Sequence, residues 1–286
     1  MTLVYIGSSV FALAVLDAAQ IAPALVVSRP PSRRGRGRRT LPTPVAAGAR
    51  ERGFEVREPE RLEELADELA ALRPELVCLC AYGAMVREPL LSEYEIVGVH
   101  PSLLPRWRGA APIERAIMAG DDRTGVALLR LVAALDAGPV CATGELAIEA
   151  GDDYESLSGR LSALAGTLLA AAVRGPRVYA DQDPSGVTYA AKIAPAERIL
   201  DPGRPAAELE RVVRALHPHV GARLRDGLGV SRARVAAAPE LEPGALRAHE
   251  GRLYLGATPG TLELERVTPP GGRPMDAAAY LRGHAV

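Results

Sequence analysis

One histidine and one aspartate, 36 positions apart, are the residues of this sequence most suited to moving a proton. His100 ends the apolar run IVGVH and precedes Pro101, which favours an extended exit from a strand. Asp136 lies in the stretch LDAGP, where an aspartate is by default a turn-forming residue. If this carboxylate approaches His100, it can orient the imidazole as the partner of a general base. The sequence leaves that contact open.

The loop after His100 is stiff in composition. It holds the single tryptophan, Trp107, between two arginines, and it carries three prolines and a glycine: Pro101, Pro105, Pro112 and Gly109. A rigid loop directly after a buried strand is a common place for a functional site. A lone histidine more often serves only the core, and this position puts a catalytic His100 on a par with that alternative.

Strands that alternate with helices predict an α/β fold with a doubly wound, mostly parallel sheet. Short apolar runs predict strands at 3–6, 24–27, 54–56, 76–80 and 96–100. Helical spacing predicts helices at 10–19, 45–52 and 60–72, and a longer one from about residue 153. Ligands bind beyond the carboxyl ends of such strands, where Gly7, Tyr82, Gly83 and His100 fall.

A basic stretch stands out in a chain whose net charge is −1. Residues 33–39 read RRGRGRR, and the prolines and glycines in and around them indicate a loop rather than a helix face. Such a patch is typical of proteins that bind an anionic partner, either nucleic acid or phosphate. The alternative is a solvated loop without a partner.

Composition excludes several classes of protein. The 286 residues are 24% charged and 48% hydrophobic, the balance of a soluble globular chain of about two domains. The longest apolar run, 163–173, is shorter than the roughly 20 residues that span a bilayer, and the start MTLVYIG lacks a basic segment. We therefore expect a cytoplasmic protein without a membrane partner.

The sequence also argues against a bound metal and against a nicotinamide cofactor. Cys78, Cys80 and Cys141 fit buried hydrophobes better than a disulfide or zinc site, so no metal is expected. The turn after the first strand reads GSSVFA and lacks the second and third glycines of a dinucleotide fingerprint, which argues against a nicotinamide cofactor.

The composition changes after residue 174. We expect an α/β domain over 1–180, a proline-rich linker over 181–204 and a smaller β-rich domain, a barrel by its short strands, over 205–286.

The run VHPSLLPRWRGAAPIERAIMAGD, followed by LDAG, resembles the folate-dependent formyltransferases, and PRWRGAAPI with the arginine loop favours the methionyl-tRNA formyltransferase family. AYG at 81–83, LPTPV at 41–45 and VTYAAKI at 187–193 extend the resemblance over essentially the whole chain. It implies a Rossmann-like formyltransferase domain and an OB-like tRNA-binding domain. It also implies a monomeric enzyme of translation initiation, which moves a formyl group from 10-formyltetrahydrofolate to the α-amine of methionyl initiator tRNA.

The same resemblance implies roles for individual residues. His100 and Asp136 belong to the catalytic set. The folate-contacting positions are Ser102, Leu103, Leu104 and Pro105, with Tyr82 and Gly83. The tRNA-binding positions are Arg33, Arg34, Arg36, Arg38 and Arg39, of which Arg36 matches the loop arginine that inserts at the acceptor end.

The sequence departs from the family at a catalytic position. Gly98 stands where the family has an asparagine, and losing one oxyanion donor typically costs about 10²–10³ in turnover. Acidic family positions are also lost at Val132, Pro139 and Val10, and Ser9 replaces a proline. Three consequences are open. A water or backbone N–H replaces the amide, or the chain only binds folate or tRNA, or it serves a related role such as formyl transfer to an amino sugar or hydrolysis of the folate donor.

Overall fold

The computed structural model describes residues 1–34, 39–237 and 241–284. The chain divides into two compact units. Unit 1 comprises Met1–Gly109, Arg123–Leu146 and Ser158–Tyr189, and unit 2 comprises Ala110–Asp122, Ala147–Leu157 and Ala190–Val286.

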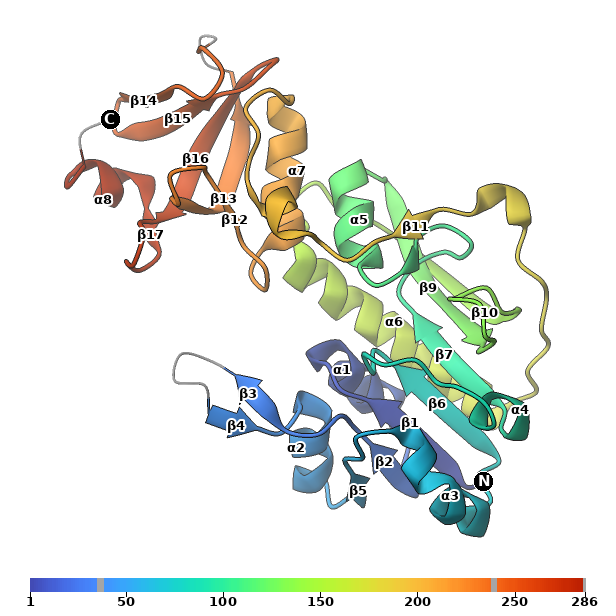
Figure 1. The fold of residues 1–286 in the computed structure, drawn as a ribbon. Coiled ribbons are helices and arrows are strands. Elements are labelled where there is room, and N and C mark those ends of the chain that lie inside the picture. Colours follow the sequence, from blue (N-terminus) through green and yellow to red (C-terminus); the bar gives the residue numbers. More distant parts are fainter. Residues whose placement is uncertain (35–38, 238–240, 285–286) are drawn as a thin grey trace. The chain divides into compact units, whose positions relative to one another are not determined.

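Unit 1 is built on a seven-stranded sheet in the order β10-β9-β7-β6-β1-β2-β5 (Figure 1). The five strands from β7 to β5 are parallel, whereas β9 runs antiparallel to β7. The expected doubly wound, mostly parallel sheet is therefore confirmed. The strands are β1 (Leu3–Gly7), β2 (Leu25–Val27), β5 (Val56–Arg57), β6 (Leu76–Cys80), β7 (Ile96–His100), β9 (Arg123–Arg130) and β10 (Val140–Ala147).

Helices cover both faces of this sheet. Val4 and Ile6 of β1 pack in one buried cluster with the leucines of a 3₁₀ turn and helix α3, whereas Tyr5 points to the other face and donates its hydroxyl to the carbonyl of Ala12 at 2.6 Å. This alternation follows from the two-residue period of a strand. The helices of the unit are α1 (Val10–Ala19), α2 (Pro44–Glu51), the 3₁₀ turn η1 (Leu62–Leu65), α3 (Ala66–Leu72), α4 (Leu90–Glu93) and most of α6 (Tyr154–Arg174).

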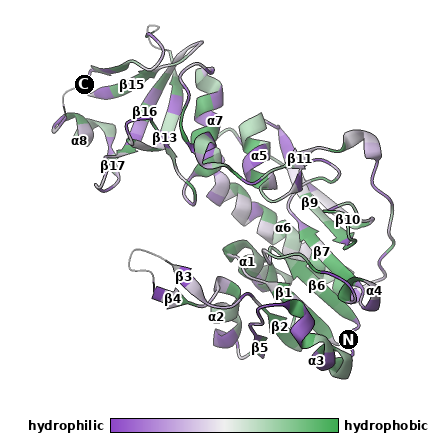
Figure 2. Ribbon diagram, in the orientation of Figure 1, coloured by the Kyte–Doolittle hydropathy of each residue, from purple (hydrophilic) through white to green (hydrophobic). Residues whose placement is uncertain are grey.

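Helix α6 is long and apolar enough to cross a membrane by length and composition alone. A core helix of a globular domain passes the same test, and α6 has the contacts of one. Leu157, Leu161 and Leu169 are fully buried, and the backbone at Gly166 lies so close to Ala18 of α1 that a Cβ there would stand 2.4 Å from the Ala18 methyl. The central strands β6 and β7 are likewise strongly apolar (Figure 2).

The arginine-rich stretch differs from the loop that the sequence suggested. Its flanks are the paired strands β3 (Ser32–Arg34) and β4 (Arg39–Leu41), with Arg34 opposite Arg39. Antiparallel pairing provides hydrogen-bond partners for the backbone of these flanks. The glycines and prolines of the sequence did not reveal this pairing. Arg36 and Arg38 lie outside the described residues.

Unit 2 carries an antiparallel sheet in the order β12-β13-β16-β15-β14, with β17 also paired to β16. Apolar residues of α7, among them Leu209, Val213 and Leu216, share one buried core with Leu253 and Leu262 of the sheet. The elements are α5 (Pro112–Ala119), α7 (Ala206–Leu216), β12 (Ala222–Arg223), β13 (Gly229–Ala236), β14 (Leu246–His249), β15 (Arg252–Gly256), β16 (Thr261–Thr268), β17 (Met275–Asp276) and α8 (Ala277–Leu281). The expected separate C-terminal sheet domain is thus present.

An ion-pair network ties the start of β7 to the segment after α6. The Arg177 guanidinium donates to both carboxylate oxygens of Glu95 at 2.8 and 3.0 Å, and the Tyr179 hydroxyl donates to Glu95 at 2.7 Å. These contacts lower the pKa of Glu95 from its ordinary value of 4.5 to about 2, and the contact with Arg177 has the largest effect. Burial, followed by the hydrogen bond to the same carboxylate, raises the pKa of Tyr179.

The depressed pKa makes unit 1 sensitive to acid. A carboxylate whose pKa is lower in the folded state stabilises that state fully above its unfolded pKa, and the contribution is lost as the pH falls toward the folded value. We therefore expect Glu95→Gln to lower the free energy of unfolding above pH 4.5, and expect its difference from the parent to shrink toward pH 2.

Urea unfolding followed by the fluorescence of Trp107, the single tryptophan and a member of unit 1, measures this difference. Glu93→Gln, an exposed neighbour, is the matched control and should track the parent across the range. A Glu95→Gln deficit that does not change with pH would contradict the assignment.

Candidate active site

The imidazole of His100 is held at the carboxyl end of β7. The residue is only 6% exposed, and its Nε2 lies 2.8 Å from the carbonyl oxygen of Trp107. Because a carbonyl can only accept, Nε2 carries the proton and donates it. The nitrogen that remains for proton exchange is Nδ1, which lies 3.6 Å from Oδ2 of Asp136.

The structure therefore brings together the two residues that the sequence singled out. Strand β9 pairs with β7 in the antiparallel sense and runs away from His100, from Ala127 to Arg130, so the segment after β9 brings Asp136 back to the imidazole. The Oδ2 atom that faces the imidazole also accepts the backbone N–H of Gly109 at 2.8 Å. A fixed carboxylate beside a buried imidazole is the arrangement of a base and its orienting partner.

Both groups that flank the imidazole come from strained backbone. Trp107 has φ +63° and Asp136 has φ +48°, in the left-handed region that residues with a side chain seldom adopt. Such conformations cost on the order of 1–3 kcal/mol each and persist only where surrounding contacts enforce them. Both residues that flank the His100 ring have this conformation.

The space beside Gly98 is filled by apolar side chains. A Cβ at this position would lie 2.9 Å from Cδ2 of Leu131 and 3.2 Å from Cδ2 of Leu129, which faces Gly98 across the β7–β9 ladder. Gly98 and His100, two residues apart on β7, share one face of the sheet. The face that carries the imidazole thus presents leucine, and not an amide, at this point.

The residues expected to contact folate differ in what they can offer. Ser102 is fully buried and donates its hydroxyl to the carbonyl of Arg106 at 2.6 Å, so this O–H already has a partner. Leu103, Leu104 and Pro105 are half-buried and present apolar surface. Tyr82 is 2% exposed, with the Arg29 guanidinium 5.8 Å from its ring centre. The neighbouring Gly83 is exposed.

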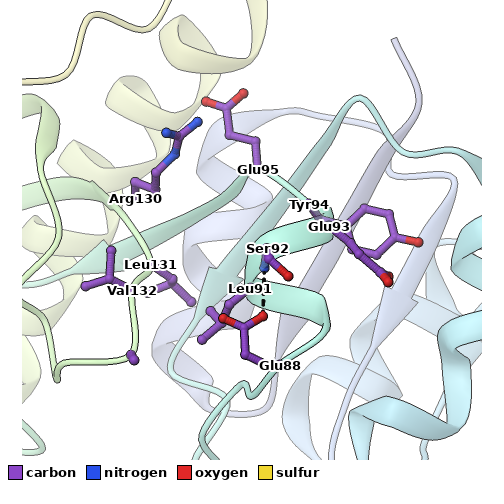
Figure 3. Close-up of a pocket in the computed structure, with 10 residues that line it drawn as sticks. Glu88, Leu91, Ser92, Glu93, Tyr94, Glu95, Arg130, Leu131 and Val132 are labelled. Atoms are coloured by element: carbon purple, nitrogen blue, oxygen red, sulfur yellow. Dashed lines mark hydrogen bonds between the residues drawn. The ribbon is translucent and has the colours of Figure 1, made fainter.

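A pocket of about 380 Å³ lies between α4 and the end of β9, and its lining includes none of the residues expected to contact folate (Figure 3). Its lining comes from α4 with its flanking residues and from the segment 130–133, which leads into the turn of Asp136. Leu131 belongs both to this lining and to the packing over Gly98. Carboxylates of Glu88 and Glu93 supply hydrogen-bond acceptors, and Arg130 supplies the positive charge.

Three sequence-identified arginines fall within the described strands β3 and β4. Arg33 and Arg39 are exposed on this hairpin, which extends outward beyond α2 in Figure 1. The backbone of Arg34 pairs with that of Arg39. The hairpin therefore places the positive charges of Arg33 and Arg39 on the surface.

The sequence analysis missed two residues that form hydrogen bonds to the site. Both lie in the segment that it interpreted as a linker. Gln182 contacts the turn of Asp136, and Thr188 accepts the backbone N–H of Trp107 at 2.8 Å. The one signal for Gln182 was its rarity, since the chain contains two glutamines and no asparagine. Among the residues that the structure describes, no group of three or more histidines, cysteines or acids could hold a metal ion.

Comparison with known proteins places both halves of the chain. The formyl transferase family model matches residues 7–173, and the model of the formyl transferase C-terminal domain matches residues 192–285. The N-formyltransferase from Helicobacter canadensis, solved in complex with folinic acid and dTDP-3-aminofucose, superimposes with a TM-score of 0.70 over 92% of this chain and 98% of its own. At 13% identity, that likeness shows the fold alone.

Two curated relatives are similar along their whole length. The methionyl-tRNA formyltransferase of Halorhodospira halophila is 42% identical over 98% of this chain and 96% of its own. That of Cereibacter sphaeroides is 40% identical over 100% of this chain and 97% of its own. With both formyl transferase domains matched and this identity across the full length, the chain belongs to the methionyl-tRNA formyltransferase family.

Proposed function

We propose that this protein is a cytoplasmic enzyme that transfers a formyl group from 10-formyltetrahydrofolate to the α-amine of methionine on initiator tRNA. The observation that carries the chemistry is the 3.6 Å approach of Asp136 Oδ2 to His100 Nδ1 at the carboxyl end of β7. The choice of acceptor rests on the full-length similarity to methionyl-tRNA formyltransferases and on the basic hairpin.

The His100–Asp136 pair handles the proton of the reaction. When the amine attacks the formyl carbon, it must lose a proton, and the leaving nitrogen must gain one. Nε2 is committed to the Trp107 carbonyl, so Nδ1 receives the proton, with Asp136 Oδ2 stabilising the charged imidazole. The protonated ring then returns the proton to the leaving group, and no net proton is consumed.

The pocket beside the turn fits a folate ring by size and by chemistry. Its volume of about 380 Å³ lies in the range of small-molecule sites. The carboxylates of Glu88 and Glu93 suit a pterin, whose edge carries several N–H donors, and Leu91 and Leu131 supply apolar contact. 10-Formyltetrahydrofolate, when bound, supplies the formyl carbon.

Formylation of charged initiator tRNA tests the function directly. We expect the purified protein to form formylmethionyl-tRNA from 10-formyltetrahydrofolate, and expect His100→Ala to lower kcat by about 10²–10⁴ with KM for tRNA nearly unchanged, because proton transfer acts in the transition state. His284→Ala, far from the site in sequence and exposed, is the control. No product at high enzyme concentration, or product with an amino sugar instead, would reject the proposal.

The hairpin arginines should act on tRNA use and not on chemistry. We expect Arg33→Ala and Arg39→Ala each to raise KM for tRNA several-fold and to reduce the slope of affinity against salt by roughly 1 per lost phosphate contact. The exposed Arg61→Ala, elsewhere on unit 1, is the control. An unchanged salt slope in both hairpin variants would remove the tRNA role from β3 and β4.

Restoring the family's asparagine should require room at Leu131. We expect Gly98→Asn to cost about 1–3 kcal/mol of stability, because its side chain enters a filled space. Combining it with Leu131→Ala should cost less than the sum of the two single changes, and the combined variant should gain more turnover than Gly98→Asn alone. Thermal unfolding of the parent, both single variants and the pair measures the coupling, and strict additivity would contradict it.

A further inference from the structure

Gln182 uses every hydrogen-bonding position of its side-chain amide. Its Oε1 accepts from Arg108 Nε at 3.0 Å and Nη2 at 2.7 Å, and its Nε2 donates to the carbonyls of Asp136 at 2.8 Å and Gly138 at 2.7 Å. A guanidinium can only donate and a carbonyl can only accept, so these partners fix the orientation of the amide.

The two segments that this amide joins are those that hold the His100–Asp136 pair. Arg108 lies between Trp107, whose carbonyl accepts from His100, and Gly109, whose N–H donates to Asp136. On the other side, Gln182 holds the backbone carbonyl of Asp136 itself, the residue with the strained φ of +48°. The strained turn and the loop after β7 are therefore tied through one side chain.

No other type of side chain of this length can make the same set of contacts. Glutamate lacks the two donors, and arginine and lysine lack the acceptor. The chain has no asparagine and only one other glutamine, Gln20, yet it has an amide side chain at this position.

We propose that Gln182 is a positioning residue for catalysis, which holds the Asp136 carboxylate against the His100 imidazole by tying the turn at 136–138 to Arg108. The proposal rests on the proposed formyl transfer. A displacement of about 1 Å in a catalytic group can cost on the order of 10² in rate. Substrate contacts are not part of the role, so turnover should suffer and affinity should not.

Steady-state kinetics of Gln182→Ala provide the first test. We expect kcat to fall roughly 10–100-fold, with KM for tRNA and for folate changed less than about threefold. Gln182→Glu keeps the length and the Arg108 contact but turns an anionic oxygen toward two carbonyls, so it should not rescue turnover. A kcat within about twofold of the parent in Gln182→Ala would overturn the proposal.

A double-mutant cycle tests whether Gln182 acts through Asp136. In an Asp136→Ala background, Gln182→Ala should cause no further loss, because the group that it positions is gone. Multiplicative losses would instead assign Gln182 an independent structural role and overturn the proposal. Gln20→Ala is the matched control, because Gln20 is an exposed glutamine at the C-terminal end of α1 and its replacement should leave kcat unchanged.

A spectroscopic readout separates this proposal from the proposed function. The ring ¹⁵N resonances of His100, assigned with His100→Ala, should shift in Gln182→Ala and remain in place in Gln20→Ala. If the parent protein fails to formylate methionyl-tRNA, formyl transfer is rejected while these resonances still report whether Gln182 positions Asp136. Unchanged His100 resonances in Gln182→Ala would overturn the positioning role whatever the activity.

Discussion

The site depends on an imidazole whose orientation is fixed by a hydrogen bond at one ring nitrogen. His100 Nε2 donates to the carbonyl of Trp107 and Nδ1 faces Asp136, and both of these neighbours have left-handed backbone that the surrounding contacts must enforce. Because the ring cannot turn without losing the Trp107 bond, the direction in which it exchanges a proton is set before any substrate arrives. The stiff loop after β7 supplies Trp107, and the turn after β9 supplies Asp136.

Beside this held ring, the chemistry of the site differs from what the family resemblance implies. Leu129 and Leu131 pack where a side chain at Gly98 would stand, so no amide side chain stabilises an oxyanion from that strand position. The substitution thus removes one hydrogen-bond donor from the face of the sheet that carries the imidazole.

Local pattern was sufficient for much of the fold and for the centre of the site. Strands 76–80 and 96–100 and the helix 10–19 appear with the predicted bounds, because their apolar periods and flanking turns are unambiguous. Strand β10 was missed because its side chains are mostly half-buried and show no clear alternation. His100 and Asp136 were identifiable from strand ends and turn chemistry. The Trp107 carbonyl, the filled space at Gly98 and Gln182 were not, since backbone acceptors, neighbouring leucines and a contact across 46 residues leave no mark in a local window.

The position of Gln182 has a consequence for how such proteins can be recombined. The family model for the first domain ends at residue 173, yet the amide that braces the turn, and the threonine that holds Trp107, follow helix α6. Unit 1 accordingly extends to Tyr189. A chimera joined to a foreign C-terminal domain at the end of α6 would keep the sheet but lose Gln182 and Thr188, whereas a junction after Tyr189 would retain both of these supporting residues.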